Sequence, residues 1–269
     1  MGSEISPEIS DDLALIRDVA QAAGAQAQAM RNAGLTTEMK ADRTPVSNAD
    51  LAIDALLKAR LGQARPDYGW LSEETADDAK RLTCKRVFVV DPIDGTRAFI
   101  RGKPWWAVCV AVVEAGQPIT GVVHAPDRAE MFEAAAGHGA RLNGVTIRAN
   151  DRPSLEGCAM LADSATFTHS KSREPWPPMR VETRNSIAYR LCSVACGEFD
   201  AALALSPKSE WDLAASALIA AEAGCVVTDD RGRSLAYNQV ITTSPGLVCA
   251  GATLHELILA RLAAIAQAG

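Results

Sequence analysis

The segment Asp91-Pro92-Ile93-Asp94-Gly95-Thr96 constrains this chain more than any other part of its sequence. It directly follows an apolar run at residues 87–90, which is typical of a buried strand. Two carboxylates three residues apart at the end of a strand repel each other unless a cation lies between them. The turn between them also leaves a backbone carbonyl free as a further oxygen ligand. The sequence therefore predicts a metal site at the end of a strand.

Gly95 and Thr96 indicate what such a metal would hold. Residues 96–99 are typical of a first helical turn, with the Thr96 hydroxyl near the N-cap and unpaired N–H groups beside it. Gly95 lets a phosphate approach the backbone closely. A metal next to a helix start favours a phosphate-containing ligand. The alternative is a simple strand-to-helix turn in which the two aspartates only cap the helix and are solvated.

Two more acidic clusters stand in similar positions. Glu73-Glu74 follows a short apolar and aromatic segment at 68–72, and Trp211-Asp212 opens an apolar helical stretch at 213–219. Hard cations take carboxylate and water oxygens rather than sulfur or imidazole. Three such clusters favour a cage for more than one Mg²⁺ ion.

The segments S-E-E, D-P-I-D-G-T and W-D occur in this order, preceded by the polar stretch 40–50. Together they resemble the inositol monophosphatase family of Mg²⁺-dependent, lithium-sensitive phosphomonoesterases over roughly residues 10 to 250. The resemblance implies a layered α-β-α-β-α sandwich that combines α+β and α/β parts. It also implies a site between the two halves and two to three Mg²⁺ ions as cofactors.

The resemblance further implies a role for each metal ligand. Glu73, Asp91 and the Ile93 carbonyl would bind the first Mg²⁺ ion. Asp91, Asp94 and Asp212 would bind the second, and a third, weaker ion would lie near Glu73.

Other matched positions belong to the catalytic set. Asp50, paired with Thr96, would orient the attacking water, and Glu73 would contribute through its metal. Lys40 corresponds to a lysine on a mobile loop near the site, and Glu74 to an acid behind the metal ligands. Bridging metal ions lower the pKa of water, so no covalent enzyme intermediate is required.

Within this family the chain most resembles the 3'(2'),5'-bisphosphate nucleotidase branch, so we expect adenosine 3',5'-bisphosphate to be its substrate. The segments 209–215, 235–238 and 245–247 are similar to that branch around the nucleotide pocket. A basic group would hold the second phosphate: Lys171, Arg173, Arg180, Arg184 and Arg190. The predicted substrate-binding residues are Gly95, Thr96, Arg184, Lys208, Tyr237 and Asn238.

Three alternatives stay open. An inositol-1-phosphate phosphatase would present a glutamate several residues before the W-D aspartate, but no acid occurs there until Glu210. A histidinol-phosphate phosphatase is favoured by the sequence T-R-A-F at 96–99. A non-catalytic binding protein that keeps the fold would be expected to lack a metal carboxylate, and here all four are present.

Composition narrows the setting. The net charge of −6 and a pI near 5.3 argue against binding to nucleic acid polymers, which requires a positive surface. Seven cysteines without a C-x-x-C pair indicate reduced thiols. Neither a leader-like segment nor an apolar run of membrane-spanning length is apparent. We expect a cytoplasmic enzyme that acts on a small phosphorylated metabolite, away from membranes, and the resemblance implies a homodimer.

The patterns divide the chain into two halves. Residues 1–150 would form an α+β half with most metal ligands, and residues 151–269 an α/β half with Asp212 and the selectivity residues. The expected helices are 11–33, 50–61, 186–197 and 212–223, and residues 36–48 have the composition of a mobile loop. The expected strands are 107–113, 119–124, 158–162, 201–205 and 225–228.

Overall fold

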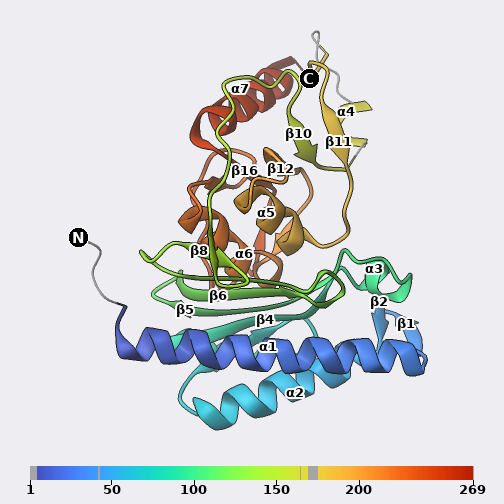
Figure 1. The fold of residues 1–269 in the computed structure, drawn as a ribbon, viewed down its shortest axis with the longest axis vertical. Coiled ribbons are helices and arrows are strands. Elements are labelled where there is room, and N and C mark those ends of the chain that lie inside the picture. Colours follow the sequence, from blue (N-terminus) through green and yellow to red (C-terminus); the bar gives the residue numbers. More distant parts are fainter. Residues whose placement is uncertain (1–4, 42, 164, 169–174, 269) are drawn as a thin grey trace.

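The computed structural model describes residues 5–41, 43–163, 165–168 and 175–268. Two β-sheets are stacked with helices below, between and above them, in the order helix, sheet, helix, sheet, helix (Figure 1). This confirms the predicted layered α-β-α-β-α sandwich. No helix in these ranges is both long and apolar enough to cross a membrane.

The first sheet has seven strands in the order β3-β4-β5-β6-β7-β8-β9. Only β3 and β4 run parallel, and the other neighbours are antiparallel. Its central strands are almost entirely buried because helices cover both faces, which explains their uninterrupted apolar runs. The strands are β3 (Gly69–Ser72), β4 (Arg86–Asp94), β5 (Ala107–Glu114), β6 (Gln117–Ala125), β7 (Glu130–Ala135), β8 (Ala140–Leu142) and β9 (Val145–Ile147).

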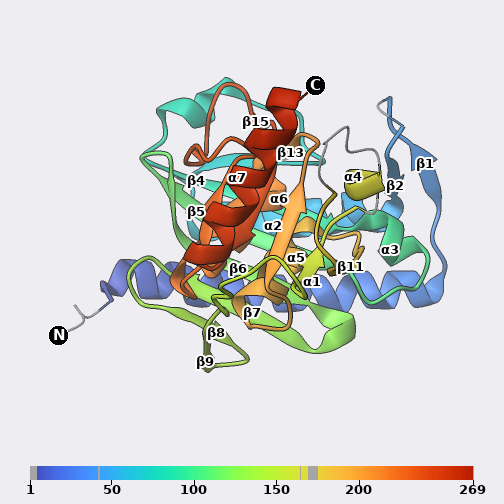
Figure 2. The ribbon, with the colours of Figure 1, turned by 90° about the horizontal axis from the view of Figure 1, so that it is seen from above.

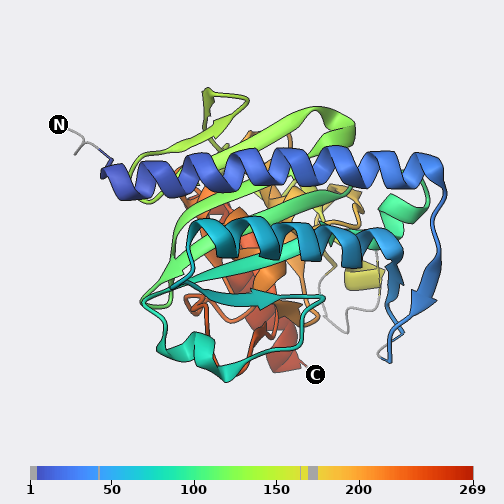
Figure 3. The same cartoon turned by 90° about the horizontal axis from the view of Figure 1, so that it is seen from below.

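Two helices, α1 (Pro7–Ala33) and α2 (Asn48–Ala64), cover the outer face of this sheet side by side (Figure 3). Both start slightly earlier than predicted because Ser6 and Ser47 cap them. Short elements join these parts: the 3₁₀ turns Ala79–Thr83 and Pro126–Arg128, and α3 (Thr96–Ile100).

The segment 36–48 is not the irregular loop that its composition predicts. It forms an antiparallel hairpin of β1 (Thr37–Met39) and β2 (Pro45–Ser47). The Lys40 N–H donates to the Thr44 carbonyl at 2.8 Å and closes the turn. Local backbone pairing therefore orders a segment whose side chains are mostly polar and exposed.

The second sheet has five strands in the order β11-β10-β12-β16-β14. Its outer face is covered by α7 (Ala252–Ala268), which crosses the top of the molecule in Figure 2. The predicted strands at 158–162, 201–205 and 225–228 correspond to β10, β12 and β14. The bounds are β10 (Ala159–Leu161), β11 (Arg180–Glu182), β12 (Ala201–Ala204), β14 (Val226–Thr228) and β16 (Leu247–Ala250). A short pair, β13 (Lys208–Ser209) and β15 (Thr243–Ser244), and the one-turn helix α4 (Ala165–Thr168) complete this part.

The middle layer consists of α5 (Ile187–Ala195) and α6 (Glu210–Glu222), which are close to the predicted helices. This layer packs closely on the first sheet at Gly121 of β6. A Cβ added there would lie only 2.9 Å from the Ala215 carbonyl oxygen of α6. The largest apolar cluster combines β4 and β5 with α5 and α6. The two sheets fall on opposite sides of residue 150, but the division into halves 1–150 and 151–269 stays a prediction.

Asp127 joins α1 to the first sheet. Its carboxylate accepts hydrogen bonds from Arg31 at 2.7 and 2.8 Å, Gln28 at 2.9 Å and the Trp106 indole at 2.7 Å. Burial alone would raise the pKa of Asp127, but these donors outweigh it and hold the pKa below its ordinary value. The carboxylate is therefore stabilised as the anion in the folded protein.

We expect Asp127→Asn to lower the free energy of unfolding at neutral pH by about 2 to 4 kcal/mol, since it weakens a largely buried, multiply bonded ion pair. The depressed pKa gives stability that is present above the unfolded pKa of about 4 and is lost as pH falls through the folded pKa. Urea titrations of both proteins should therefore converge as the pH falls below about 4. A constant difference down to low pH would contradict this role.

Candidate active site

Three buried or half-buried carboxylates meet at the end of β4. Asp91 and Asp94 are 1% and 5% exposed, and Asp212 lies in the first turn of α6. One oxygen from each lies within 4.8 Å of the others. Residues three apart on a regular strand would face opposite sides of the sheet, but a bulge in β4 between Asp91 and Asp94 turns both towards the same site. The residues predicted for the second metal are thus brought together.

Each carboxylate accepts at least one hydrogen bond that fixes its orientation. Asp91 accepts from the Ile93 N–H at 2.9 Å, and Asp212 accepts from the Ser209 N–H at 3.1 Å. Asp94 accepts from the Ser186 hydroxyl at 2.5 Å and from the Ala188 N–H at 2.7 Å. Because Ser186 is the N-cap of α5, this middle-layer helix orients Asp94.

The electrostatics of this cluster fit a bound cation. Burial and the neighbouring negative charges raise the pKa of Asp91 and Asp212 well above their ordinary values. Burial also raises the pKa of Asp94 to about 6, although its hydrogen bonds oppose the shift. A divalent cation strongly stabilises the ionised form of carboxylates that are costly to ionise close together. A donor set made only of oxygens suits Mg²⁺.

Glu73 and Glu74 lie beside this cluster and share one lysine. Lys40 Nζ is 2.7 Å from an oxygen of each, so the β1–β2 turn reaches the site. Burial raises the pKa of Glu74 to about 7, against the bond from Lys40. Burial would lower the pKa of Lys40, but the two glutamates raise it above its ordinary value. Lys40 thus stays charged and offsets the negative charge of these glutamates.

Asp50 and Thr96 form a hydrogen-bonded pair. Thr96 Oγ1 lies 3.0 Å from Asp50 Oδ1 and 3.1 Å from the Ile93 carbonyl oxygen. A hydroxyl has one proton, so it donates to only one of these acceptors and keeps its lone pairs for another donor, such as water. Ser47 donates to the other Asp50 oxygen through its N–H at 2.8 Å and its hydroxyl at 2.6 Å. Burial nevertheless raises the pKa of Asp50 above its ordinary value.

A cleft of about 350 Å³ opens over these groups. Its acidic wall consists of Glu73, Asp91, Asp94 and Asp212, with Gly95 and Thr96 beside them. Three cations, Arg97, Arg190 and Lys208, also line the cleft. The other lining residues are Thr44, Pro45, Asp163, Thr183, Asn185 and Ile187. Sequence reasoning named Lys208 and Arg190 from this wall, but Asp163, Thr183 and Asn185 belong to no motif that would have revealed them.

Three predicted substrate-binding residues do not line this cleft. The buried Arg184 guanidinium lies 2.5 Å from the exposed Glu198 carboxylate and 4.3 Å from the centre of the Trp105 ring. Tyr237 is buried at a separate pocket, and the Asn238 side chain accepts from Arg81 at 2.6 Å. The structure therefore does not bring these three residues to the cleft, because adjacency in sequence does not show where side chains point.

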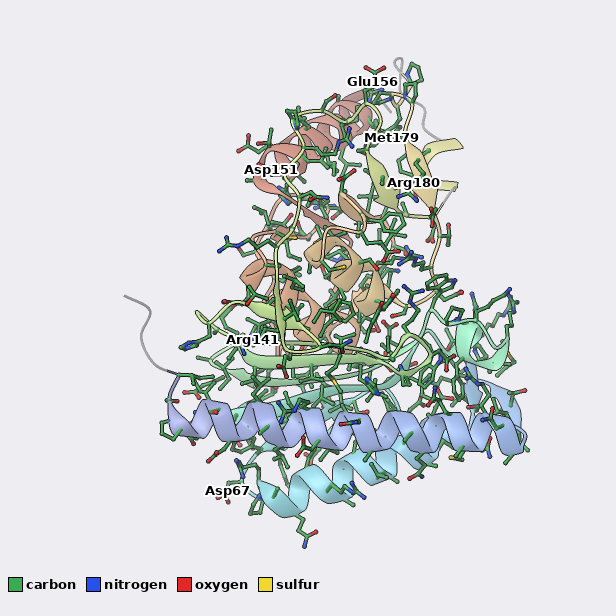
Figure 4. All side chains as sticks on the ribbon, viewed as in Figure 1. Asp67, Arg141, Asp151, Glu156, Met179 and Arg180 are labelled. Atoms are coloured by element: carbon green, nitrogen blue, oxygen red, sulfur yellow. The ribbon has the colours of Figure 1, made fainter. Side chains whose placement is uncertain are left out.

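The other residues of the predicted basic group do not gather at the cleft either. Arg180 lies on β11 in the upper, C-terminal part of the molecule, where Figure 4 labels it near Met179. It pairs there with Glu182 rather than entering the cleft. Lys171 and Arg173 lie outside the described residues. Arg190 is therefore the one member of this group that the described structure places in the cleft.

Comparison with known proteins identifies the family of this chain. The model of the inositol monophosphatase family matches residues 10–267. A histidinol-phosphatase of Streptomyces coelicolor is 34% identical, with 95% of this chain and 98% of the relative covered. The 3'(2'),5'-bisphosphate nucleotidase CysQ of Aggregatibacter actinomycetemcomitans is 30% identical, with coverage of 82% and 86%. Inositol monophosphatase 2 of Solanum lycopersicum is 33% identical, with coverage of 70% and 75%.

Solved structures show the same architecture. The inositol monophosphatase of Thermotoga maritima superimposes with a TM-score of 0.83 at 25% identity, covering 96% of this chain and all of that one. The extragenic suppressor protein suhB of Bartonella henselae gives 0.80 at 25% identity, with coverage of 94% and 98%. These similarities span several branches and favour no single one. The chain belongs to the inositol monophosphatase family and is a metal-dependent phosphomonoesterase.

Proposed function

We propose that the metal is Mg²⁺ and that two to three ions bind at the acidic wall of the cleft. Glu73, Asp91, the Ile93 carbonyl, Asp94 and Asp212 would hold them. The observation that carries this proposal is the group of three carboxylate oxygens within 4.8 Å of one another. Bound Mg²⁺ would supply Lewis-acid activation of water and neutralise charge on the phosphoryl oxygens.

The residues beside the metal ligands then position the reactants. Thr96 donates to Asp50 and presents its oxygen lone pairs to the attacking water. Asp50 is the proton acceptor at the end of this pair, and its raised pKa favours that role. Lys40 holds Glu73 and Glu74 in place by binding both.

Removal of divalent metal is expected to abolish phosphate release and added Mg²⁺ to restore it. The loss should be at least about 100-fold, since metal contributes several kcal/mol of transition-state stabilisation. Ca²⁺ should not replace Mg²⁺, because it prefers a larger and looser oxygen shell. We also expect inhibition by Li⁺, as the family resemblance implies. Full activity in excess chelator would contradict this mechanism.

We further propose adenosine 3',5'-bisphosphate as the preferred substrate. The three cations that line the cleft, Arg97, Arg190 and Lys208, would attract a substrate with more than one anionic group. The orientation of Glu210 favours this substrate over an inositol phosphate, because Glu210 is the first acid near the position where an inositol phosphatase would present a glutamate to its substrate. Its carboxylate accepts from the backbone N–H groups of Asn238 at 2.6 Å and Gln239 at 2.9 Å, so it faces away from the cleft.

Histidinol phosphate is the second candidate. A histidinol-phosphatase matches nearly the whole chain, and the exposed Asp163 carboxylate in the cleft could bind an amine. A panel of adenosine 3',5'-bisphosphate, inositol-1-phosphate and histidinol phosphate, read by phosphate release, decides between them. We expect kcat/KM for the bisphosphate to be higher by about tenfold or more. A clear preference for either other substrate would replace the ranking and leave the metal chemistry unchanged.

A cytoplasmic location and a homodimer are also proposed. All seven cysteines are free thiols, which supports a reducing compartment. Sedimentation of the purified protein would test the dimer, and a monomer at micromolar concentration would contradict it.

A further inference from the structure

Arg81 joins two segments that are far apart in the chain. It lies in the 3₁₀ turn Ala79–Thr83 and is 2% exposed. Its Nε and Nη2 donate to the Asp77 carboxylate at 2.6 and 3.0 Å. Its Nη1 donates to Asn238 Oδ1 at 2.6 Å, and its Nη2 also donates to the Gln239 carbonyl at 2.8 Å. A buried guanidinium is stable only where its donors are paired, so Arg81 holds the loop at Asn238 against the segment that follows β3.

The same loop holds the start of α6. Glu210, the first residue of that helix, is 4% exposed. Its carboxylate accepts from the N–H groups of Asn238 at 2.6 Å and Gln239 at 2.9 Å. Its own N–H donates to the Thr242 carbonyl at 2.9 Å. Asp212 follows two residues later and lines the cleft. The position of Asp212 therefore depends on the loop that Arg81 holds.

The Asp77 contact connects Arg81 to the segment that carries Glu73 and Glu74. Asp77 is the third residue after Glu74, and both Glu73 and Asp212 line the cleft. Apolar packing holds α6 on the first sheet, but such packing is not directional. A metal ligand has to be placed to within about 0.5 Å. Hydrogen bonds are directional, so those of Arg81 can fix the start of α6 more accurately than packing does.

We propose that Arg81, Asn238, Gln239 and Glu210 form a clasp that positions Asp212 for metal binding. Each link of the clasp has a charged donor or a charged acceptor, which strengthens the hydrogen bond. In the described part of the chain the cleft is lined by Asp212 but not by Arg81 or Glu210, so these two act through Asp212. This inference rests on the proposed role of Asp212 as a metal ligand, and it adds the residues that place that ligand.

Titration with Mn²⁺ tests the clasp without catalysis, because Mn²⁺ takes the same oxygen ligands as Mg²⁺ and the EPR signal of the free ion is lost on binding. Arg81→Met breaks the clasp and should raise the Kd for Mn²⁺ by about tenfold or more. Asn238→Gly removes one contact, keeps the backbone conformation and should raise the Kd by about threefold. If Arg81→Met folds poorly, Asn238→Gly alone decides, and an unchanged Kd in it would overturn the proposal.

Two further variants separate a single clasp from two independent effects. The variant that combines Arg81→Met with Asn238→Gly should bind Mn²⁺ as Arg81→Met does, since both changes break the same link. Asn238→Asp keeps an acceptor for Arg81 and should keep a Kd close to that of wild-type protein. Multiplied losses in the combined variant, or a loss in Asn238→Asp as large as that in Asn238→Gly, would contradict the clasp.

Asn143→Gly is the matched control. Asn143 has a φ of 50°, close to the 56° of Asn238, and its side chain also bonds to the backbone. It accepts from the Met131 N–H at 2.8 Å and donates to the Ala129 carbonyl at 3.0 Å, in the turn between β8 and β9. The variant should lower the Tm, as Asn238→Gly does, and leave the Kd for Mn²⁺ unchanged. An equal rise in Kd would show that loss of stability is the cause, and the proposal would be wrong.

Hydrogen exchange of metal-free protein tests the clasp independently of the proposed function. The amides of Asn238 and Gln239 donate to Glu210, and in Arg81→Met they should exchange about tenfold faster or more. Unchanged exchange in a folded variant would overturn the inference. Failure of wild-type protein to bind Mn²⁺ would instead refute the proposed metal site, and the exchange rates would still show whether the clasp holds the start of α6.

Discussion

Asp212→Asn is expected to eliminate phosphatase activity while leaving the fold intact. Asp212 supplies one of three oxygens that converge within 4.8 Å, and an amide is a much weaker ligand for Mg²⁺. Loss of one metal should reduce kcat by about 1,000-fold or more, which corresponds to several kcal/mol in the barrier. The asparagine oxygen can still accept from the Ser209 N–H, so the start of α6 should be preserved.

Asp94→Asn should have the same effect on turnover, and the thermal behaviour of both variants identifies the cause. Mg²⁺ should raise the Tm of wild-type protein, because a ligand that binds only the folded state stabilises it, and should raise that of the variants less. Without metal, Asp212→Asn should melt at or above the wild-type Tm, since one of several crowded charges is gone. Retention of more than about a tenth of wild-type turnover by both variants would refute the assignment.

Gly95→Ala is expected to damage both stability and catalysis. Gly95 has a φ of 91°, and an added Cβ would lie 2.7 Å from the Trp105 carbonyl oxygen and 3.1 Å from the backbone N of Ser186. The left-handed conformation costs a non-glycine residue about 1 to 2 kcal/mol before any contact is counted. Relief of the contacts would shift Ser186, which holds Asp94. We expect a loss of about 2 to 4 kcal/mol in unfolding free energy and about 100-fold in kcat.

Gly102→Ala is the matched control for this change. Gly102 also has a positive φ, of 63°, but an added Cβ there meets no atom within 4 Å. It should lose about 1 kcal/mol of stability through the backbone alone and keep wild-type kcat. Denaturant titration and initial rates measure both effects. Equal catalytic losses in the two variants would show that contact with Ser186 is not the cause.

The convergence of Asp91 and Asp94 could be predicted from the sequence because their motif encodes its own geometry. A strand that ends in two aspartates and a glycine fixes Asp91 and Asp94 locally, and the W-D pair sits at a helix start that periodicity also predicts. The resemblance then related Asp212 to the other two, which no local pattern could do. The structure places all three together.

The residues that line the cleft were harder to predict because side-chain direction depends on tertiary packing. Arg184 and Arg190 both belong to one basic stretch, yet the first pairs with Glu198 away from the cleft and the second lines the cleft. Asp163 carries no sequence signal, since a single acid after a strand is common. The hairpin β1–β2 was missed for a related reason, because backbone pairing overrode a loop-like composition.

The position of α5 and α6 between the two sheets has a consequence for how the protein is made. Asp91 and Asp94 leave the ribosome long before Asp212, and the helix that orients Asp94 also comes later in the chain. The nascent N-terminal sheet therefore has an incomplete cation site and an uncovered apolar face. Docking of the middle layer completes the cation site and covers the apolar face at the same time. A metal that needs all three carboxylates is therefore expected to bind only after the whole sandwich has assembled.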